Sequence, residues 1–194
     1  MNIASGTPVQ KGVSLSDINP KDYIVELMAE KFNGYTCVAI KGKNGIEEGV
    51  LVFHDGSIVS SDYEYYRYNK RIVAEEGLLR TLNAFLASKG VMDSFSLSPY
   101  QVQLIMTLND DCNLKNEITN SASLPFPNAF SYSYEEALVE TKRETKEYAK
   151  DVLLKKYGLS RMAGPKVTRA ILLESADDEN KRIDRMIKKK GRGE

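Results

Sequence analysis

The single histidine, His54, is the residue with the clearest capacity for catalysis. A histidine beside a carboxylate can act as a general base, and Asp55 follows His54 directly. Adjacent residues of a strand point to opposite faces, however, so the two side chains need not cooperate. A nucleophilic Cys37 would need a nearby base, and the strand pairing we expect does not bring it to His54. We interpret His54 as an exposed turn residue.

Metal and phosphate sites are equally weakly supported. One histidine with two isolated cysteines, Cys37 and Cys112, makes a typical zinc site hard to build. The sequence Gly-Lys-Asn-Gly at 42–45 has the glycines and lysine of a phosphate loop. It lacks the Gly-Lys-Ser/Thr ending and a following helix, so a hairpin turn explains it better. We therefore predict no catalytic residue, no metal and no cofactor.

A dense aromatic run lies between positions 62 and 68. Tyrosines beside arginine can stack on nucleic-acid bases, although Asp62 and Glu64 would repel a phosphate backbone. Tyrosine is also common in protein interfaces, and it can simply pack internally. The candidate interaction residues of this run are Tyr63, Tyr65, Tyr66, Arg67 and Tyr68.

Charge is balanced overall but uneven along the chain. The 194 residues contain 27 Lys and Arg and 27 Asp and Glu. Met1–Cys112 has 10 basic and 14 acidic residues, whereas Asn113–Glu194 has 17 basic and 13 acidic. The tail residues Lys188, Lys189, Lys190 and Arg192 are a candidate electrostatic contact for RNA, DNA or an acidic partner. A disordered, solubilising tail is the alternative.

Hydrophobic periodicity predicts the elements that must position these residues. Asn19-Pro20 caps a helix that ends at Asn33-Gly34. Strands are expected at 35–41, 48–53 and 57–64, followed by a long helix at 69–89, a short strand at 92–97 and a helix capped by Ser98-Pro99. We expect residues 1–17 to form an N-terminal arm, in which Val9 and Val13 pair at a sheet edge.

Two turns set the expected strand register. A two-residue Asn44-Gly45 turn would place Lys41 opposite Glu48 and Val38 opposite Leu51. The turn at Asp55-Gly56 would place Phe53 opposite Ile58 and Val52 opposite Val59. Both faces of this hairpin are then apolar, so helices or a partner must cover each face.

These elements predict an α+β fold. We expect a small antiparallel sheet of three to four strands flanked by helices over residues 1–112, a linker at 113–132, and an α-helical region with a basic tail at 133–194. The capping box Ser133-x-x-Glu136 opens the last region, with a helix expected to Tyr157. No signal peptide or membrane span is evident, so we expect a cytoplasmic protein.

The hairpin sequence also carries a family resemblance. Phe32-Asn33-Gly34-Tyr35, followed by the segment 45–59 (Gly-Ile-Glu-Glu-Gly-Val-Leu-Val-Phe-His-Asp-Gly-Ser-Ile-Val), resembles an uncharacterised archaeal domain family. More distantly it is similar to the bacterial PATAN-type domain, over Pro20–Leu108. The resemblance implies an adaptor or regulatory module that binds other proteins, and it implies no activity. The tyrosine run differs from the PATAN pattern. The PATAN resemblance does not extend to residues 113–194.

Three hypotheses about function follow. The first is a non-enzymatic interaction module that holds a protein partner or a second copy through the sheet face or the run Tyr63–Tyr68. The second is a nucleic-acid-associated factor that uses the basic C-terminal region. The third is an enzyme of unfamiliar type built around His54 or a carboxylate cluster.

Overall fold

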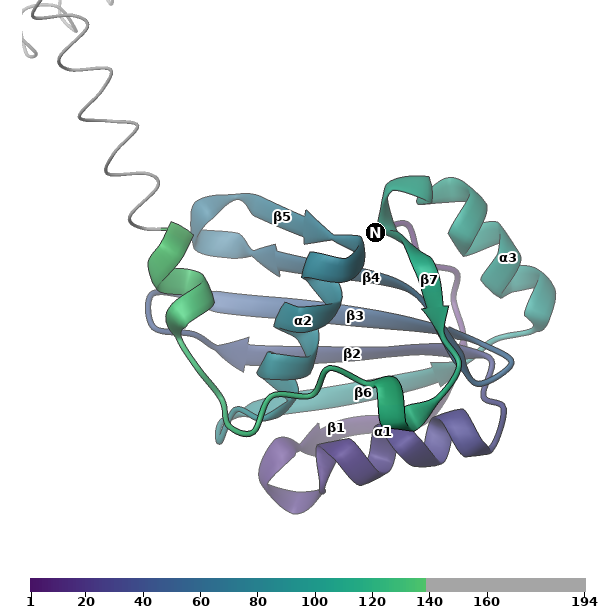
Figure 1. Cartoon of the computed structure of the whole chain (residues 1–194), viewed down its shortest axis with the longest axis horizontal. Helices are drawn as coiled ribbons and strands as arrows, with labels where there is room; N and C mark the ends of the chain where they lie inside the picture. Colours follow the sequence, from purple (N-terminus) through teal and green to yellow (C-terminus); the bar gives the residue numbers. More distant parts are fainter. Residues whose placement is uncertain (139–194) are drawn as a thin grey trace, which may run out of the picture. The chain divides into compact units, whose positions relative to one another are not determined.

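An extended antiparallel sheet organises the first part of the chain, as a computed structural model shows for residues 1–138 (Figure 1). The compact unit comprises Met1–Ala137. Its strands are β1 (Thr7–Ser14), β2 (Gly34–Lys41), β3 (Ile46–His54), β4 (Ser57–Tyr65), β5 (Lys70–Val73), β6 (Gly90–Ser96) and β7 (Asn113–Ile118). Its α-helices are α1 (Pro20–Ala29), α2 (Ala74–Phe85) and α3 (Pro99–Leu108). Four short 3₁₀ helices connect these elements: Leu15–Asp17, Tyr66–Tyr68, Asp110–Cys112 and Ser121–Ser123.

The predicted small sheet of three to four strands is wrong, because the sheet has seven strands. Their order is β1-β6-β2-β3-β4-β5, and β7 also pairs with β4. The additional strands lie at the edges: β1 belongs to the arm that was expected to pair there, and its Val13 lies opposite Met92 of β6, whereas β5 and β7 were not expected. There β1 is exposed along most of its length and β7 buries little besides Leu114. Such strands are held by backbone pairing and carry no alternation of buried and exposed residues that a sequence pattern could detect.

The strand register also differs from the prediction. The β2–β3 connection is a wider turn, in which the Gly42 amide donates to the Gly45 carbonyl, so Lys41 lies opposite Ile46 and Val38 opposite Gly49. The β3–β4 hairpin was predicted correctly at its tip, where Phe53 lies opposite Ile58. A bulge then shifts the pairing, and Val52 lies opposite Ser60 instead of Val59.

One face of the sheet, here called the front face, carries the larger core. Leu51, Phe53 and Ile58 are fully buried on it. Helix α2 crosses this face over β2, β3 and β4 (Figure 1). Its Thr81 hydroxyl lies 3.4 Å from that of Ser61 on β4. Helix α1 packs on the same face, where the Tyr23 hydroxyl donates to Ser94 on β6 at 2.8 Å.

The opposite, back face carries a second core under α3. Tyr35, Val50 and Val52 pack there against Val102 and Ile105 of α3. The N-terminal arm, residues 1–6, adds apolar side chains to the same cluster. Both faces of the hairpin are therefore covered, as the apolar pairs at its tip predicted.

Helix boundaries follow local chemistry. The Asn19 side chain accepts hydrogen bonds from the amides of Lys21 and Asp22, which caps α1 as predicted. A complete capping box between Ser98 and Gln101 starts α3. The expected helix at 69–89 is shorter, because residues 70–73 form β5 against β4. There, pairing with an existing strand outweighs helix propensity.

The stretch 113–132, expected as a linker, contributes β7 and a 3₁₀ turn to the first unit. A helix begins at residue 133, close to the predicted start, and is described up to residue 138. Its first turn is closed by the Tyr132 carbonyl, which accepts the Glu135 and Glu136 amides, in place of the predicted Ser133–Glu136 capping box. The rest of the predicted helical region, 139–194, lies outside the described residues. Within the described part, no helix is long and apolar enough to cross a membrane.

Candidate functional site

The structure separates the tyrosines that the sequence grouped together. Tyr63 and Tyr65 are 2% and 1% exposed and point into the front-face core, where their rings lie 5.0 Å apart. Tyr66 is 51% exposed, and Arg67 is exposed as well. The Tyr66 hydroxyl donates to Glu48 Oε2 at 2.6 Å, which raises the Tyr66 pKa to about 12. Two of the five candidate interaction residues are therefore core residues.

A buried carboxyl cluster explains why Tyr63 points inward. Its hydroxyl donates to Glu47 Oε2 at 2.6 Å, and Glu47 is 6% exposed. The backbone of Gly42 lies against the Glu47 carboxyl, where a Cβ would collide with it. Burial, followed by the nearby carboxylate of Glu135, raises the pKa of Glu47 to about 7. Glu47 is therefore protonated over much of the range in which surface carboxyls are charged.

Glu135 attaches a later segment of the chain to this cluster. Its two carboxylate oxygens accept the backbone amides of Lys43 and Asn44 at 2.7 and 2.9 Å. The Tyr68 hydroxyl donates to the same side chain at 3.3 Å. The segment 130–137, here called the anchor segment, is held further by the Arg80 guanidinium, which lies 5.1 Å from the Tyr134 ring centroid. This set of contacts fixes the β2–β3 turn.

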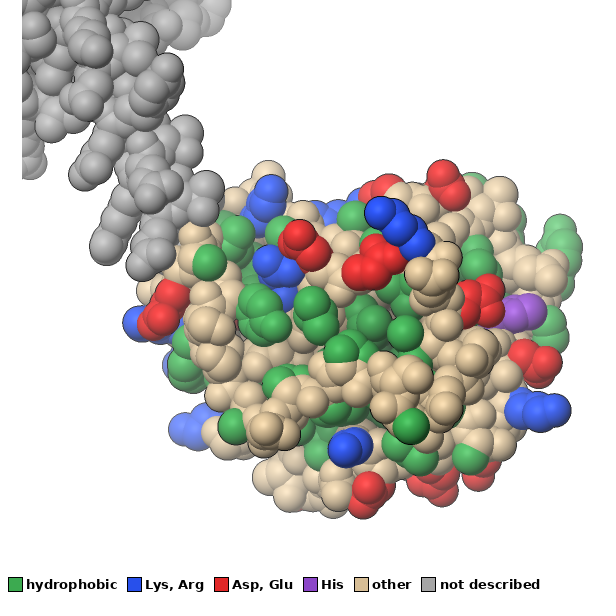
Figure 2. Space-filling model, in the orientation of Figure 1, with side chains coloured by type: hydrophobic (Ala, Val, Ile, Leu, Met, Phe, Trp, Pro, Cys, Tyr) green, Lys and Arg blue, Asp and Glu red, His purple; other side chains and the backbone are tan. Residues whose placement is uncertain are grey.

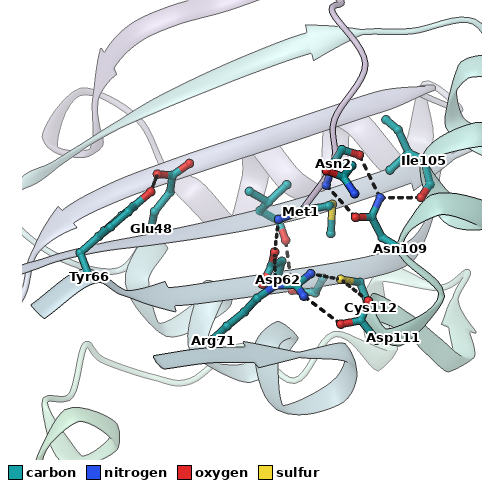
Figure 3. Close-up of polar contacts among 12 residues, drawn as sticks. Met1, Asn2, Glu48, Asp62, Tyr66, Arg71, Ile105, Asn109, Asp111 and Cys112 are labelled. Carbon is teal, nitrogen blue, oxygen red and sulfur yellow. Dashed lines mark hydrogen bonds and ion pairs between the residues drawn. The ribbon is translucent and has the colours of Figure 1, made fainter. Parts of the chain in front are cut away.

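A second polar network lies on the back face, on β4 and β5 (Figure 3). Asp62 is nearly buried; its Oδ1 lies 2.9 Å from Arg71 Nε, and its Oδ2 lies 2.7 Å from the α-amino group of Met1. The Arg71 guanidinium also donates to Asp111 at 2.8 Å and to Cys112 Sγ. Two cationic groups thus neutralise one buried carboxylate, and the network ties β4 to the turn after α3.

Asn109 extends this connection to the N-terminal arm (Figure 3). Its amide nitrogen donates to the Ile105 and Asn2 carbonyls at 2.7 and 2.9 Å, and its Oδ1 accepts the Asn2 amide at 2.6 Å. The arm and the C-terminal end of α3 are therefore held together. This network fixes the orientation of α3 on the back face.

The outer side of α3 then presents a row of large apolar side chains. Tyr100, Leu104 and Leu108 are 75%, 43% and 58% exposed. They recur every four residues, so they lie on one side of the helix, away from the buried Val102 and Ile105. The helix contains no charged residue. Depletion of charge with exposed tyrosine and leucine is typical of a protein interface.

This α3 row, defined by Tyr100, Leu104 and Leu108, was not among the predicted interaction sites. The predicted interaction residues were those of the tyrosine run and the basic tail. The apolar residues of this helix form two stripes while one stripe suffices for the core, so the sequence indicates that one stripe is exposed without showing which of the two it is.

Two other sets of residues remain without a site. His54 lies opposite Ser57 beside the hairpin turn, and its side chain makes no hydrogen bond to any residue of the described part. Lys188, Lys189, Lys190 and Arg192 lie outside the described residues. Between positions 1 and 138, no group of three or more His, Cys, Asp or Glu side chains could hold a metal ion.

Both cysteines are predicted to react slowly in the native protein. Burial raises the pKa of Cys37 and of Cys112 to about 12, so the reactive thiolate is scarce near neutral pH. We expect alkylation by iodoacetamide at pH 8 to be at least ~100-fold slower than that of free cysteine, whose pKa is about 8.5. Unfolding in guanidinium should restore the ordinary rate. Rapid labelling of the folded protein, located by mass spectrometry, would contradict the burial of the labelled thiol.

Comparisons with known proteins support part of the predicted resemblance. A family model described as "Uncharacterized protein conserved in archaea (DUF2226)" matches residues 1–109. No curated protein and no solved structure matches the chain, and the predicted PATAN similarity is not shown. The matched residues include α1, α2, α3 and every strand except β7. Because this match spans more than half of the chain, the protein belongs to that archaeal family.

Proposed function

We propose that this domain is a non-enzymatic protein-interaction module that pairs with a second copy of itself through the α3 row. The exposed Tyr100, Leu104 and Leu108 on an uncharged helix carry the proposal. A contiguous exposed apolar surface of this kind is unfavourable in water and is typical of a contact with another protein. The anchoring through Asn109 means that the row is presented in a fixed orientation, which lowers the entropic cost of binding.

The spacing of the row suits a two-fold symmetric contact. Leu104 lies midway between Tyr100 and Leu108, four residues from each. When two such helices pack antiparallel with Leu104 at the symmetry axis, Tyr100 of each copy meets Leu108 of the other. A symmetric dimer requires this kind of self-complementary surface, in which residue i contacts j and j contacts i.

The charges near α3 suit the same arrangement. Two copies of this helix bring no like charges together, because α3 has none. Asp110 follows the helix and would lie beside Ser98 at the helix N-terminus of the other copy. A carboxylate is stabilising at that end because the helix dipole is positive there.

Net charge disfavours nucleic-acid binding by residues 1–138, whereas the predicted nucleic-acid contact lies in the basic C-terminal region. Residues 1–138 contain 11 Lys and Arg against 17 Asp and Glu. A surface of that balance repels a phosphate backbone. A protein surface free of charge, such as α3, has no such conflict.

The proposal is tested by sedimentation equilibrium of the full chain over a wide range of concentration. We expect a reversible monomer–dimer equilibrium that Leu104→Lys weakens by at least ~10-fold, because it places two like charges at the symmetry axis. Leu79→Lys is the matched control, since Leu79 is an exposed leucine of α2, and it should leave the equilibrium unchanged. A strictly monomeric wild type, or a dimer that Leu104→Lys leaves intact, would overturn the proposal.

A further inference from the structure

A pocket of about 550 Å³ lies where the β2–β3 turn, the α2–β6 connection and the anchor segment meet. Lys41, Gly42 and Lys43 contribute one wall, Ala87, Ser88 and Lys89 another, and Phe130 and Tyr132 a third. Its volume is within the range of small-molecule sites, about 300–1,000 Å³. Figure 2 shows basic side chains at this end of the sheet, at the left of the view.

The aromatic wall is held rigidly. The buried side chain of Asn83 donates to the Ser131 carbonyl and accepts the Ser131 amide, both at 2.9 Å. This pair of bonds fixes Ser131 between Phe130 and Tyr132, whose rings lie 4.8 Å apart, edge to face. Tyr132 is nonetheless 44% exposed. An exposed aromatic ring on a clamped backbone is a preorganised surface on which another ring can stack.

The basic wall includes two lysines that form no ion pair with any residue of positions 1–138. Lys43 forms an ion pair with Glu136 at 2.8 Å. Lys41 and Lys89 are exposed, and neither forms an ion pair within residues 1–138. Unpaired ammonium groups at the rim of a concave site attract anions, and phosphate oxygens are suited to such donors.

We propose that this pocket binds a phosphorylated ligand with a planar ring, of the nucleoside polyphosphate class. Lys41 and Lys89 contact the phosphates, and Tyr132 stacks on the ring beside Phe130. Stacking of a base on an aromatic side chain contributes without requiring a particular base. Lys41 ends β2, whereas the α3 core packs around Tyr35 at the start of that strand. The ligand site is therefore separate from the α3 row, and it stands whether or not the protein dimerises.

Calorimetric titration of the full chain tests the proposal, with ATP, pyrophosphate and adenosine as probes in the presence of EDTA. We expect ATP to bind more tightly than either fragment, because each fragment uses one wall. The double variant Lys41→Gln/Lys89→Gln should lose at least ~10-fold in affinity for ATP, and Tyr132→Ala should lose a similar factor for ATP but not for pyrophosphate. The matched control is Lys21→Gln/Lys31→Gln, which changes an exposed lysine of α1 and an exposed lysine of the turn that follows it and should bind as the wild type does.

Three results would overturn the proposal. One is a wild type that does not bind ATP. Another is ATP binding that survives the Lys41→Gln/Lys89→Gln change, since the phosphates would then be held by basic residues elsewhere in the chain. The third is pyrophosphate binding as tight as ATP binding, which would exclude the ring contact. A thermal melt of each variant separates loss of binding from loss of folding.

Discussion

Replacing Glu47 by glutamine is expected to raise the free energy of unfolding by about 3 kcal/mol above pH 8 and to change it little near pH 4. Burial and the nearby Glu135 carboxylate raise the pKa of Glu47 from 4.5 to about 7 in the folded protein. Between pH 4.5 and about pH 7, Glu47 holds a proton in the folded state that it has released in the unfolded state. Wild-type stability therefore falls as pH rises from about 4.5 to 7, and the full penalty remains above that range.

The glutamine side chain keeps the favourable contacts of the protonated acid without the ionisation. Its carbonyl can still accept the hydrogen bond that the Tyr63 hydroxyl donates to Glu47 at 2.6 Å. Urea unfolding at a series of pH values measures the difference in the free energy of unfolding between the wild type and the variant. Glu117→Gln is the matched control, because Glu117 is an exposed carboxylate on β7 and should give a difference near zero at every pH. A Glu47→Gln difference that does not vary with pH would rule out a buried, protonated Glu47.

Ionisation of Glu47 also affects how the anchor segment is attached to the sheet. Glu135 accepts two backbone amides of the β2–β3 turn and lies beside Glu47. When Glu47 ionises, the two carboxylates repel each other, and the attachment of residues 130–137 is weakened. The pocket proposed above uses Phe130 and Tyr132 from that segment. We therefore expect ATP affinity to fall from pH 6 to pH 8 in the wild type and to vary less in Glu47→Gln.

The parts of the fold that follow from local chemistry could be predicted. The cap at Asn19, the capping box at Ser98 and the pairing of Phe53 with Ile58 are set by a few neighbouring residues. Strand β7 could not be predicted, because what holds it is the edge of β4, contributed by a distant part of the chain. Strand β5 follows β4 after a short 3₁₀ turn, and it was missed because its four residues were taken as the start of the helix expected at 69–89. The β2–β3 register failed for a related reason, since Glu135, from a distant segment, accepts the amides of Lys43 and Asn44 and stabilises a wider turn than Asn44-Gly45 suggests.

The candidate site was predicted less well than the fold. A run of tyrosines in the sequence indicates neither which rings point inward nor their partners. Tyr63 is directed inward by Glu47, whereas Tyr66 is directed outward toward Glu48. The α3 row could be recognised as exposed only after Val102 and Ile105 were known to satisfy the back-face core. Exposure depends on which of two apolar stripes the rest of the chain covers, and a single helix sequence does not specify that.

Gly56→Ala is expected to destabilise the protein by about 3 kcal/mol, and Gly12→Ala by about 1 kcal/mol. Both glycines have a left-handed φ, +83° and +63°, which costs any other residue backbone strain. They differ in their surroundings, because nothing lies within 4 Å of a Cβ at Gly12. A Cβ at Gly56 would overlap the Met28 carbonyl oxygen, a backbone atom of α1 that cannot move alone.

Comparing the two variants separates the cost of backbone strain from the cost of the steric overlap between a Cβ at Gly56 and α1. The Gly56 amide also donates to the Phe32 carbonyl at 3.0 Å, so the hairpin tip cannot withdraw from α1 without losing that bond. Denaturant unfolding of both variants at one pH measures the loss of unfolding free energy in each. Gly12→Ala is the control, because it introduces the backbone strain of a left-handed φ without a steric collision. Equal destabilisation would mean that the tip of the β3–β4 hairpin does not press on α1. A larger loss at Gly56 would identify this contact as the one that sets the distance between the hairpin and the helix.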